Sequence, residues 1–76
     1  MPQYPLNAKG LLCPLPVLRA RKALKPLRVG DVLVVETTDA ASPADFTAFC
    51  LATGHRLIAS DQAGEVYRFE IEKSAG

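Results

Sequence analysis

The sequence predicts an α+β fold, a two-layer sandwich in the order β-α-β-α-β-β, with a mixed four-stranded sheet and two helices on one face. Residues 14–25 and 42–53 carry apolar side chains at helical spacing. Residues 32–37 form a β-branched run and residues 65–72 alternate between apolar and charged side chains, both typical of strands. Two helices cannot easily cover both faces of so small a sheet, so we expect the opposite face to be open to water or to a partner.

Size and composition restrict the class of protein. The chain has 76 residues, of which 49% are hydrophobic and 22% charged, so we expect a single folded domain over residues 1–76. No apolar run approaches the roughly 20 residues that span a bilayer, and the first residues lack the pattern of a signal peptide. Two cysteines and one histidine are too few for a self-contained zinc site or a disulfide scaffold. We therefore expect a cytoplasmic protein with free thiols, no membrane partner, and no metal or organic cofactor.

The first half of the chain contains two predicted strands and one predicted helix. Residues 4–6 are a candidate for a short first strand. The helix predicted over residues 14–25 ends at Pro26 and has one apolar face, formed by Val17, Ala20 and Leu24. A turn at Gly30-Asp31 precedes the strand predicted over residues 32–37, which should be largely buried.

A second helix is expected to begin at Ser42. Ser42 can cap it, Pro43 suits its first turn, and Asp45 suits the positive end of its dipole. Gly54 provides the stop. The apolar face of this helix consists of Phe46, Phe49, Cys50 and Thr53.

The last third of the chain predicts a pair of strands. Residues 56–60 are expected to form one strand, residues 61–64 a loop, and residues 65–72 the other strand. In the last strand the inward side chains are expected to be Tyr67, Phe69 and Ile71.

The candidate for chemistry is Cys13, which lies between the first predicted strand and the first predicted helix. Pro14 and Pro16 each disfavour helical geometry in the residue before them, so Cys13 and Leu15 are expected to be extended. Cys13 would then stand at the positive end of the helix, where the dipole and the free N–H groups of Leu15 and Val17 favour a thiolate. We therefore expect a lowered thiol pKa. The alternative is an unreactive apolar cysteine buried under the loop.

The segment Cys13-Pro14-Leu15-Pro16 resembles the signature of the TusA/SirA-like sulfur carriers, a Cys-Pro-x-Pro motif at the start of the first helix that follows a short strand and a glycine, here Gly10. The Gly30-Asp31 turn and residues 49–55 are also similar, so the resemblance covers essentially the whole chain. It implies the same β-α-β-α-β-β sandwich. One loop departs from the family, which often has Asp-x-Arg-Gly where this chain has Asn7-Ala8-Lys9-Gly10.

The resemblance also implies a function. Cys13 would accept a sulfane sulfur as a persulfide from a cysteine desulfurase or another donor and relay it to the thiol of an acceptor sulfur-relay protein. Such a chain is a carrier in sulfurtransferase-type reactions rather than an enzyme by itself. Family outlets for the sulfur include tRNA 2-thiolation, molybdenum-cofactor synthesis and sulfur oxidation, and the sequence leaves the choice among them open.

The charge is distributed unevenly along the chain. Residues 1–30 carry six bases and no acid, whereas residues 31–76 carry three bases and eight acids, so a formal charge of +1 conceals a strong asymmetry. Two leucines lie among the bases of the first helix, so we expect a surface that docks partner proteins beside the thiol. The candidate docking residues are Lys9, Leu15, Leu18, Arg19 and Lys22. The alternative is a solvated basic face. The basic charge is also expected to help hold Cys13 as a thiolate.

Two other functions fit parts of the pattern. A small nucleic-acid-binding or regulatory module could use the basic helix, but Tyr67 and Phe69 are expected to point inward and leave no aromatic platform, so no direct nucleic-acid partner is expected. A thiol redox protein would need a resolving cysteine, whereas Cys50 is expected to be a buried structural thiol. His55 is either a general base for Cys13 or a capping or surface histidine. The oligomeric state stays open.

Overall fold

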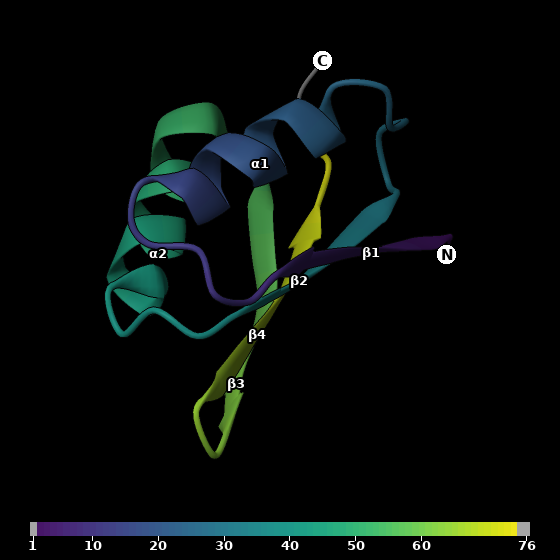
Figure 1. The fold of residues 1–76 in the computed structure, drawn as a ribbon. Helices are drawn as coiled ribbons and strands as arrows, with labels where there is room; N and C mark the ends of the chain where they lie inside the picture. The colour runs from purple at the N-terminus through teal and green to yellow at the C-terminus, as the bar shows by residue number, and fades with distance from the viewer. Residues whose placement is uncertain (1, 75–76) are drawn as a thin grey trace.

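The computed structural model describes residues 2–74 and contains one four-stranded mixed sheet. The strands are β1 (Gln3–Ala8), β2 (Val32–Thr37), β3 (Arg56–Ala63) and β4 (Val66–Glu72), in the spatial order β1-β2-β4-β3. β1 runs parallel to β2, while β4 pairs antiparallel with both β2 and β3 (Figure 1). The predicted β-α-β-α-β-β order and mixed sheet are confirmed.

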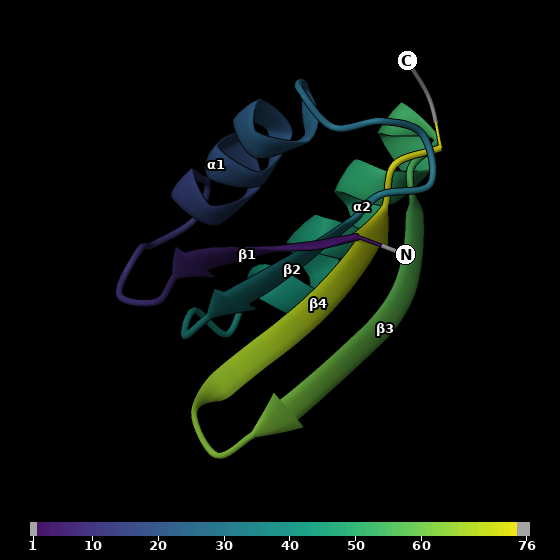
Figure 2. The ribbon, with the colours of Figure 1, turned by 90° about the vertical axis from the view of Figure 1, so that its right-hand side faces the viewer.

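Both helices lie on the same face of the sheet. α1 (Leu15–Leu24) packs on β1 and β2, and α2 (Ser42–Thr53) packs on β3 and β4. Figure 2, in which the strands form one layer in front of α2, shows that the β3–β4 turn extends beyond the helices. The two-layer α+β sandwich is therefore confirmed.

The core lies between the two layers and contains the side chains that the sequence pattern placed on the inner faces. Phe46 of α2 stacks on Phe69 of β4 with ring centroids 4.7 Å apart, and both rings are fully buried. Ala20 and Leu24 of α1 are buried as predicted, whereas Val17 is half-buried. Ile71 is fully buried and Tyr67 packs at the edge of the core. Burial of these apolar groups is the main source of stability for a chain of this size.

Three strands are longer or shorter than local sequence suggests. β1 extends over six residues because each of them, from Gln3 to Ala8, pairs with a residue of β2. The loop predicted over residues 61–64 is wrong, since Asp61, Gln62 and Ala63 continue β3 and pair with β4. Cross-strand hydrogen bonds here outweigh the low strand propensity of Asp and Ala. The turn is confined to Gly64-Glu65, so β4 begins at Val66.

The start of α2 also differs from the prediction. Ser42 does not cap the helix, because its hydroxyl is buried and has no hydrogen-bond partner in the described part of the chain. Instead, the Ser42 N–H donates to the Asp39 carbonyl at 3.0 Å, and the Ala41 N–H donates to Asp39 Oδ1 at 3.1 Å. Asp39 therefore provides the capping groups. At the other end, Gly54 has a φ of 82° and ends the helix as predicted.

The outer face of the sheet is polar, as expected for a face open to water. Arg68 and Glu70 of β4 form an ion pair, and Arg56 of β3 pairs with Glu72 of β4 at 3.9 Å. Lys9 pairs with Glu36 of β2 at 3.6 Å. These partly exposed pairs keep the face charged and each contributes little to stability.

The C-terminal end of α1 is held by a buried lysine. Lys73, which is 7% exposed, donates from Nζ to the carbonyls of Leu24 and Lys25, each at 2.9 Å. These carbonyls have no partner within the helix, and a cation beside them also complements the helix dipole. The residue after β4 thus ties the last strand to the end of the first helix.

We predict that Lys73→Met lowers the free energy of unfolding by about 2 kcal/mol, because it removes two charge-assisted hydrogen bonds from the end of α1. The Leu24 carbonyl keeps its hydrogen bond from the Leu27 N–H at 3.1 Å. Urea denaturation followed by circular dichroism measures this change. Lys22→Met removes an exposed lysine from α1 and serves as the control. It should change stability far less. Equal stability of the two variants would contradict a capping role for Lys73.

Candidate functional site

The candidate site lies at one edge of the sheet, where two loops meet. β1 and β2 are parallel neighbours, so their carboxyl ends lie side by side. The loop after β1 contains residues 9–14, and the loop after β2 contains residues 38–41. Figure 1 shows these two loops adjacent to each other at the N-terminal ends of α1 and α2. Residues far apart in the sequence are thereby brought together around Cys13.

The loop after β2 holds the cysteine loop by hydrogen bonds. The Gly10 N–H donates to Thr38 Oγ1 at 2.9 Å, and the Cys13 N–H donates to Asp39 Oδ2 at 2.6 Å. Because the same Asp39 carboxylate also accepts from the N–H of Ala41, it connects the cysteine loop to the start of α2. Gly10 has a φ of 81°, a conformation that strongly favours glycine. The position of Cys13 is thus set by hydrogen bonds from its loop to the Thr38 and Asp39 side chains.

The two prolines place Cys13 immediately before α1. Pro14 is the N-cap residue, Pro16 is buried in the first turn, and the Cys13–Pro14 peptide bond is cis. Leu15 is already helical, so the prediction of an extended Leu15 is wrong. Its N–H donates to the Leu12 carbonyl at 2.9 Å and is not free to stabilise a thiolate. The start of α1 therefore fixes the position of Cys13 but supplies fewer free donors than predicted.

The Cys13 side chain is exposed and borders a shallow groove between α1 and α2. The groove has a volume of about 330 Å³. Its walls are mostly apolar, and its lining residues are Cys13, Pro14, Val17, Asp45, Ala48 and Phe49. The interpretation of Cys13 as a cysteine buried under the loop is therefore wrong.

Acidic residues, rather than the helix dipole, dominate the electrostatics of the thiol. A hydrogen bond to the Asp45 carboxylate raises the pKa of Cys13 above that of an ordinary cysteine, and partial desolvation and the charges of Asp45 and Asp39 add to this effect. The prediction of a lowered pKa is therefore wrong. It counted the bases of the first helix, whereas the folded chain places two carboxylates closer to the sulfur. In the free protein, Cys13 favours the protonated thiol at neutral pH.

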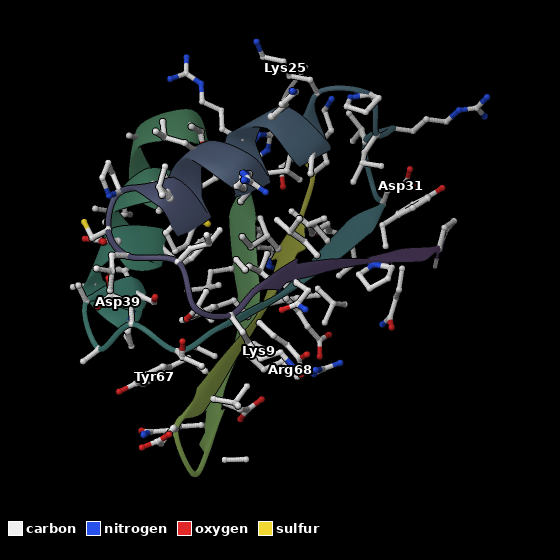
Figure 3. All side chains as sticks on the ribbon, viewed as in Figure 1. Lys9, Lys25, Asp31, Asp39, Tyr67 and Arg68 are labelled. Atoms are coloured by element: carbon white, nitrogen blue, oxygen red, sulfur yellow. The ribbon has the colours of Figure 1, made fainter. Side chains whose placement is uncertain are left out.

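The predicted docking residues divide into two groups in the structure. Leu15 and Leu18 are 44% and 50% exposed, and Arg19 and Lys22 are exposed beside them on the outer face of α1. Lys9 lies apart from this face, because its ammonium pairs with Glu36. Figure 3 shows Lys9 near Arg68 at the sheet, well separated from Lys25 at the end of α1.

His55 does not act on Cys13. It follows α2, whereas Cys13 lies near the first turn of that helix, so the length of α2 separates them. His55 Nδ1 accepts a hydrogen bond from the Ser74 N–H at 3.3 Å. Burial, and then the charge of Lys73, lower the pKa of His55. Its surroundings are those of a structural histidine at the edge of the core.

Cys50 is a free thiol that is 6% exposed in the core, where burial raises its pKa. Its predicted role as a buried structural thiol agrees with this position. A disulfide between the exposed Cys13 and the buried Cys50 would require the core to open.

Sequence reasoning missed the residues that hold Cys13. Thr38 and Asp39 directly follow a buried strand, and Asp45 was explained by helix capping alone. Their signal lay in the topology: side chains that follow two adjacent parallel strands meet at one edge of the sheet. Leu12 was also missed, although it is 71% exposed next to Cys13 and adds to the apolar surface around the thiol.

The described residues contain neither a metal-binding cluster nor a membrane-spanning helix. Within residues 2–74, no group of three or more His, Cys, Asp or Glu side chains is arranged to hold a metal ion. Over the same range, no helix has the length and apolar character needed to cross a membrane.

Comparison with known proteins places this chain in a family. The family model described as "Sulfurtransferase TusA" matches residues 4–73. The chain belongs to the TusA family of sulfur carrier proteins. The sulfur carrier protein TusA of Allochromatium vinosum is 48% identical over 69 residues, which cover 91% of each chain.

Other relatives agree with this assignment. A protein of Neisseria meningitidis serogroup A, which bears a provisional sulfur-carrier name, is 57% identical over 60 residues, covering 78% of this chain and 81% of that protein. The crystal structure of a SirA-like protein from Desulfitobacterium hafniense superposes with a TM-score of 0.82 at 26% identity, covering 95% of this chain and 99% of the other. Membership in the TusA family thus rests on both sequence and fold.

The raised pKa of Cys13 in this TusA-family chain gives a testable pH dependence. A raised pKa means that less thiolate is present at a given pH, so the midpoint of iodoacetamide alkylation should lie at higher pH in the folded protein than in urea. Asp45→Asn replaces the carboxylate beside the thiol with a neutral amide. We predict that it shifts the midpoint to lower pH and increases alkylation severalfold at about pH 7.

Peptide mapping by mass spectrometry distinguishes Cys13 from Cys50 in this assay. Glu65→Gln removes the same charge from the exposed β3–β4 turn and should leave the midpoint unchanged. A lower rate in Asp45→Asn than in the unmodified chain would show that Asp45 does not suppress the thiolate.

Proposed function

We propose that this chain is a cytoplasmic sulfur carrier in which Cys13 accepts a sulfane sulfur from a cysteine desulfurase, or another persulfide donor, and relays it to an acceptor thiol. The observation that carries the proposal is the exposed Cys13 thiol of a chain that matches the TusA family model. Hydrogen bonds to Thr38 and Asp39 hold its loop at the edge of the sheet. A rigid, accessible thiol suits direct exchange between two large proteins. The burial of Cys50 leaves Cys13 as the thiol that a partner can reach.

The transfer step is a thiol–persulfide exchange. The Cys13 thiolate attacks the outer sulfur of the donor persulfide, a new S–S bond forms at Cys13, and the donor S–S bond breaks. The proton released by the Cys13 thiol goes to the leaving donor thiolate, so no oxidant or reductant is consumed. Delivery to the acceptor repeats the same exchange with Cys13 as donor.

The outer face of α1 is the proposed docking surface. Leu12, Leu15 and Leu18 are exposed apolar residues close to Cys13, and Arg19 and Lys22 add positive charge beside them. A partner with an apolar patch and acidic groups around its reactive cysteine fits this surface. Lys9 would join it only by leaving Glu36. The inward positions of Tyr67 and Phe69 favour a protein partner over single-stranded nucleic acid, which binds on exposed aromatic side chains.

The acceptor decides which pathway the carrier serves. By resemblance to the family, the proposed outlets are tRNA 2-thiolation, molybdenum-cofactor synthesis and sulfur oxidation. Each requires an acceptor sulfur-relay protein with its own reactive thiol, and capture of the Cys13 persulfide by that thiol distinguishes among them.

The central prediction concerns loading. When the protein is incubated with a cysteine desulfurase and cysteine, we predict that its intact mass increases by one sulfur atom. Cys13→Ser should gain none, and Cys50→Ser should load like the unmodified chain, provided that it remains folded. Equal loading of Cys13→Ser, or no loading of the unmodified chain, would refute the proposal.

A second prediction concerns docking. Arg19→Glu reverses a charge on the proposed surface and should slow loading about tenfold at low ionic strength, with a smaller effect in high salt. Alkylation of Cys13 by iodoacetamide should change little, because that reagent needs no docking. Arg28→Glu makes the same charge change outside the proposed surface and should slow loading much less. Equal effects of the two substitutions would argue against a specific docking face.

A further inference from the structure

We propose that Asp45 sets the sulfur-transfer equilibrium of Cys13: it disfavours the loaded, anionic persulfide and thereby makes the carrier a ready sulfur donor. This inference rests on the proposed function and adds a role for a residue outside the Cys-Pro-x-Pro motif. It concerns the equilibrium between loaded and empty carrier, which is distinct from whether Cys13 can be loaded at all.

The position of Asp45 follows from the start of α2. Asp45 lies in the first turn, where its N–H donates to the Ala41 carbonyl at 3.0 Å. Its side chain is half-buried and borders the same groove of about 330 Å³ as the Cys13 sulfur. The other lining residues are apolar, so no cation of the groove offsets the Asp45 charge beside the sulfur.

A second carboxylate acts in the same direction. Asp39 Oδ2 accepts the Cys13 N–H at 2.6 Å, so its negative charge is also close to the cysteine. Neither Asp39 nor Asp45 forms an ion pair within residues 2–74. α1 contributes Val17 rather than a cation to the lining of this groove, since Arg19 and Lys22 lie on its exposed face. The sulfur therefore lies near two carboxylates that no lysine or arginine of residues 2–74 pairs with.

These charges affect the empty and the loaded carrier differently. The empty carrier is a neutral thiol in the groove that it shares with the Asp45 carboxylate. A persulfide is a stronger acid than the corresponding thiol, so the loaded carrier is an anion over a wider pH range. The Asp45 carboxylate thus stabilises the empty state and destabilises the loaded state.

The exchange with an acceptor consumes no oxidant or reductant. Cys13–S–S⁻ and R–SH give Cys13–SH and R–S–S⁻: the S–S bond at Cys13 breaks, an S–S bond forms on the acceptor, and the acceptor proton ends on Cys13. The negative charge leaves the neighbourhood of Asp45 together with the sulfur. Release is therefore favoured by the same carboxylate that suppresses the free thiolate.

The test is an equilibrium measurement with 2-mercaptoethanol as the neutral acceptor. Persulfidated protein is incubated with a series of thiol concentrations, trapped with iodoacetamide and analysed by intact mass. We expect Asp45→Asn to retain more sulfur, with an equilibrium constant for release about threefold to tenfold lower than that of the unmodified chain. Glu65→Gln, the matched charge change in the distant turn, should give the unmodified value.

Two further measurements separate charge from structure. Asp45→Glu keeps the negative charge and should release sulfur more readily than Asp45→Asn. The difference between the unmodified chain and Asp45→Asn should shrink as the pH is lowered and the persulfide becomes protonated. Equal equilibrium constants for the unmodified chain and Asp45→Asn at neutral pH would overturn the inference, whereas failure of every variant to take up sulfur would instead overturn the proposed function.

Discussion

The parallel pairing of β1 with β2 is the constraint on which the site depends. It brings the ends of both strands to one edge of the sheet, so that Asp39 can accept the N–H of Cys13 and Thr38 can accept that of Gly10. Because Asp39 also receives the Ala41 N–H, the same carboxylate orders the start of α2 and hence the position of Asp45. The exposed thiol, its groove and its electrostatic surroundings all follow from this one arrangement.

The sequence predicted the elements well because their signals are local. Helical spacing over residues 14–25 and 42–53, and alternation over residues 65–72, correspond to faces that are buried in the structure. The predictions were wrong where contacts between residues far apart in the sequence determine the structure. Pairing with β4 extends β3 through Ala63, and Asp39 replaces Ser42 as the source of capping groups.

The same distinction applies to the site. The motif was enough to identify Cys13, Gly10 and the two prolines, because these residues lie close together in the sequence. The environment of the thiol could not, because Asp39 and Asp45 are 26 and 32 positions further along the chain. A count of charges near Cys13 in sequence predicts a thiolate, whereas the fold brings carboxylates to the sulfur and favours the thiol. A carrier built in this way keeps its empty form neutral while the basic face of α1 remains available to partners.

The most direct test of the constraint is hydrogen exchange at the Cys13 amide. In Asp39→Ala this N–H loses a charge-assisted acceptor, and we expect its exchange rate to increase about tenfold or more, with a parallel increase at Ala41. Asp61→Ala, a substitution on the exposed end of β3, should leave both amides unchanged. Unaltered protection of Cys13 in folded Asp39→Ala would contradict the account, because the cysteine loop would then be held by something other than the end of β2.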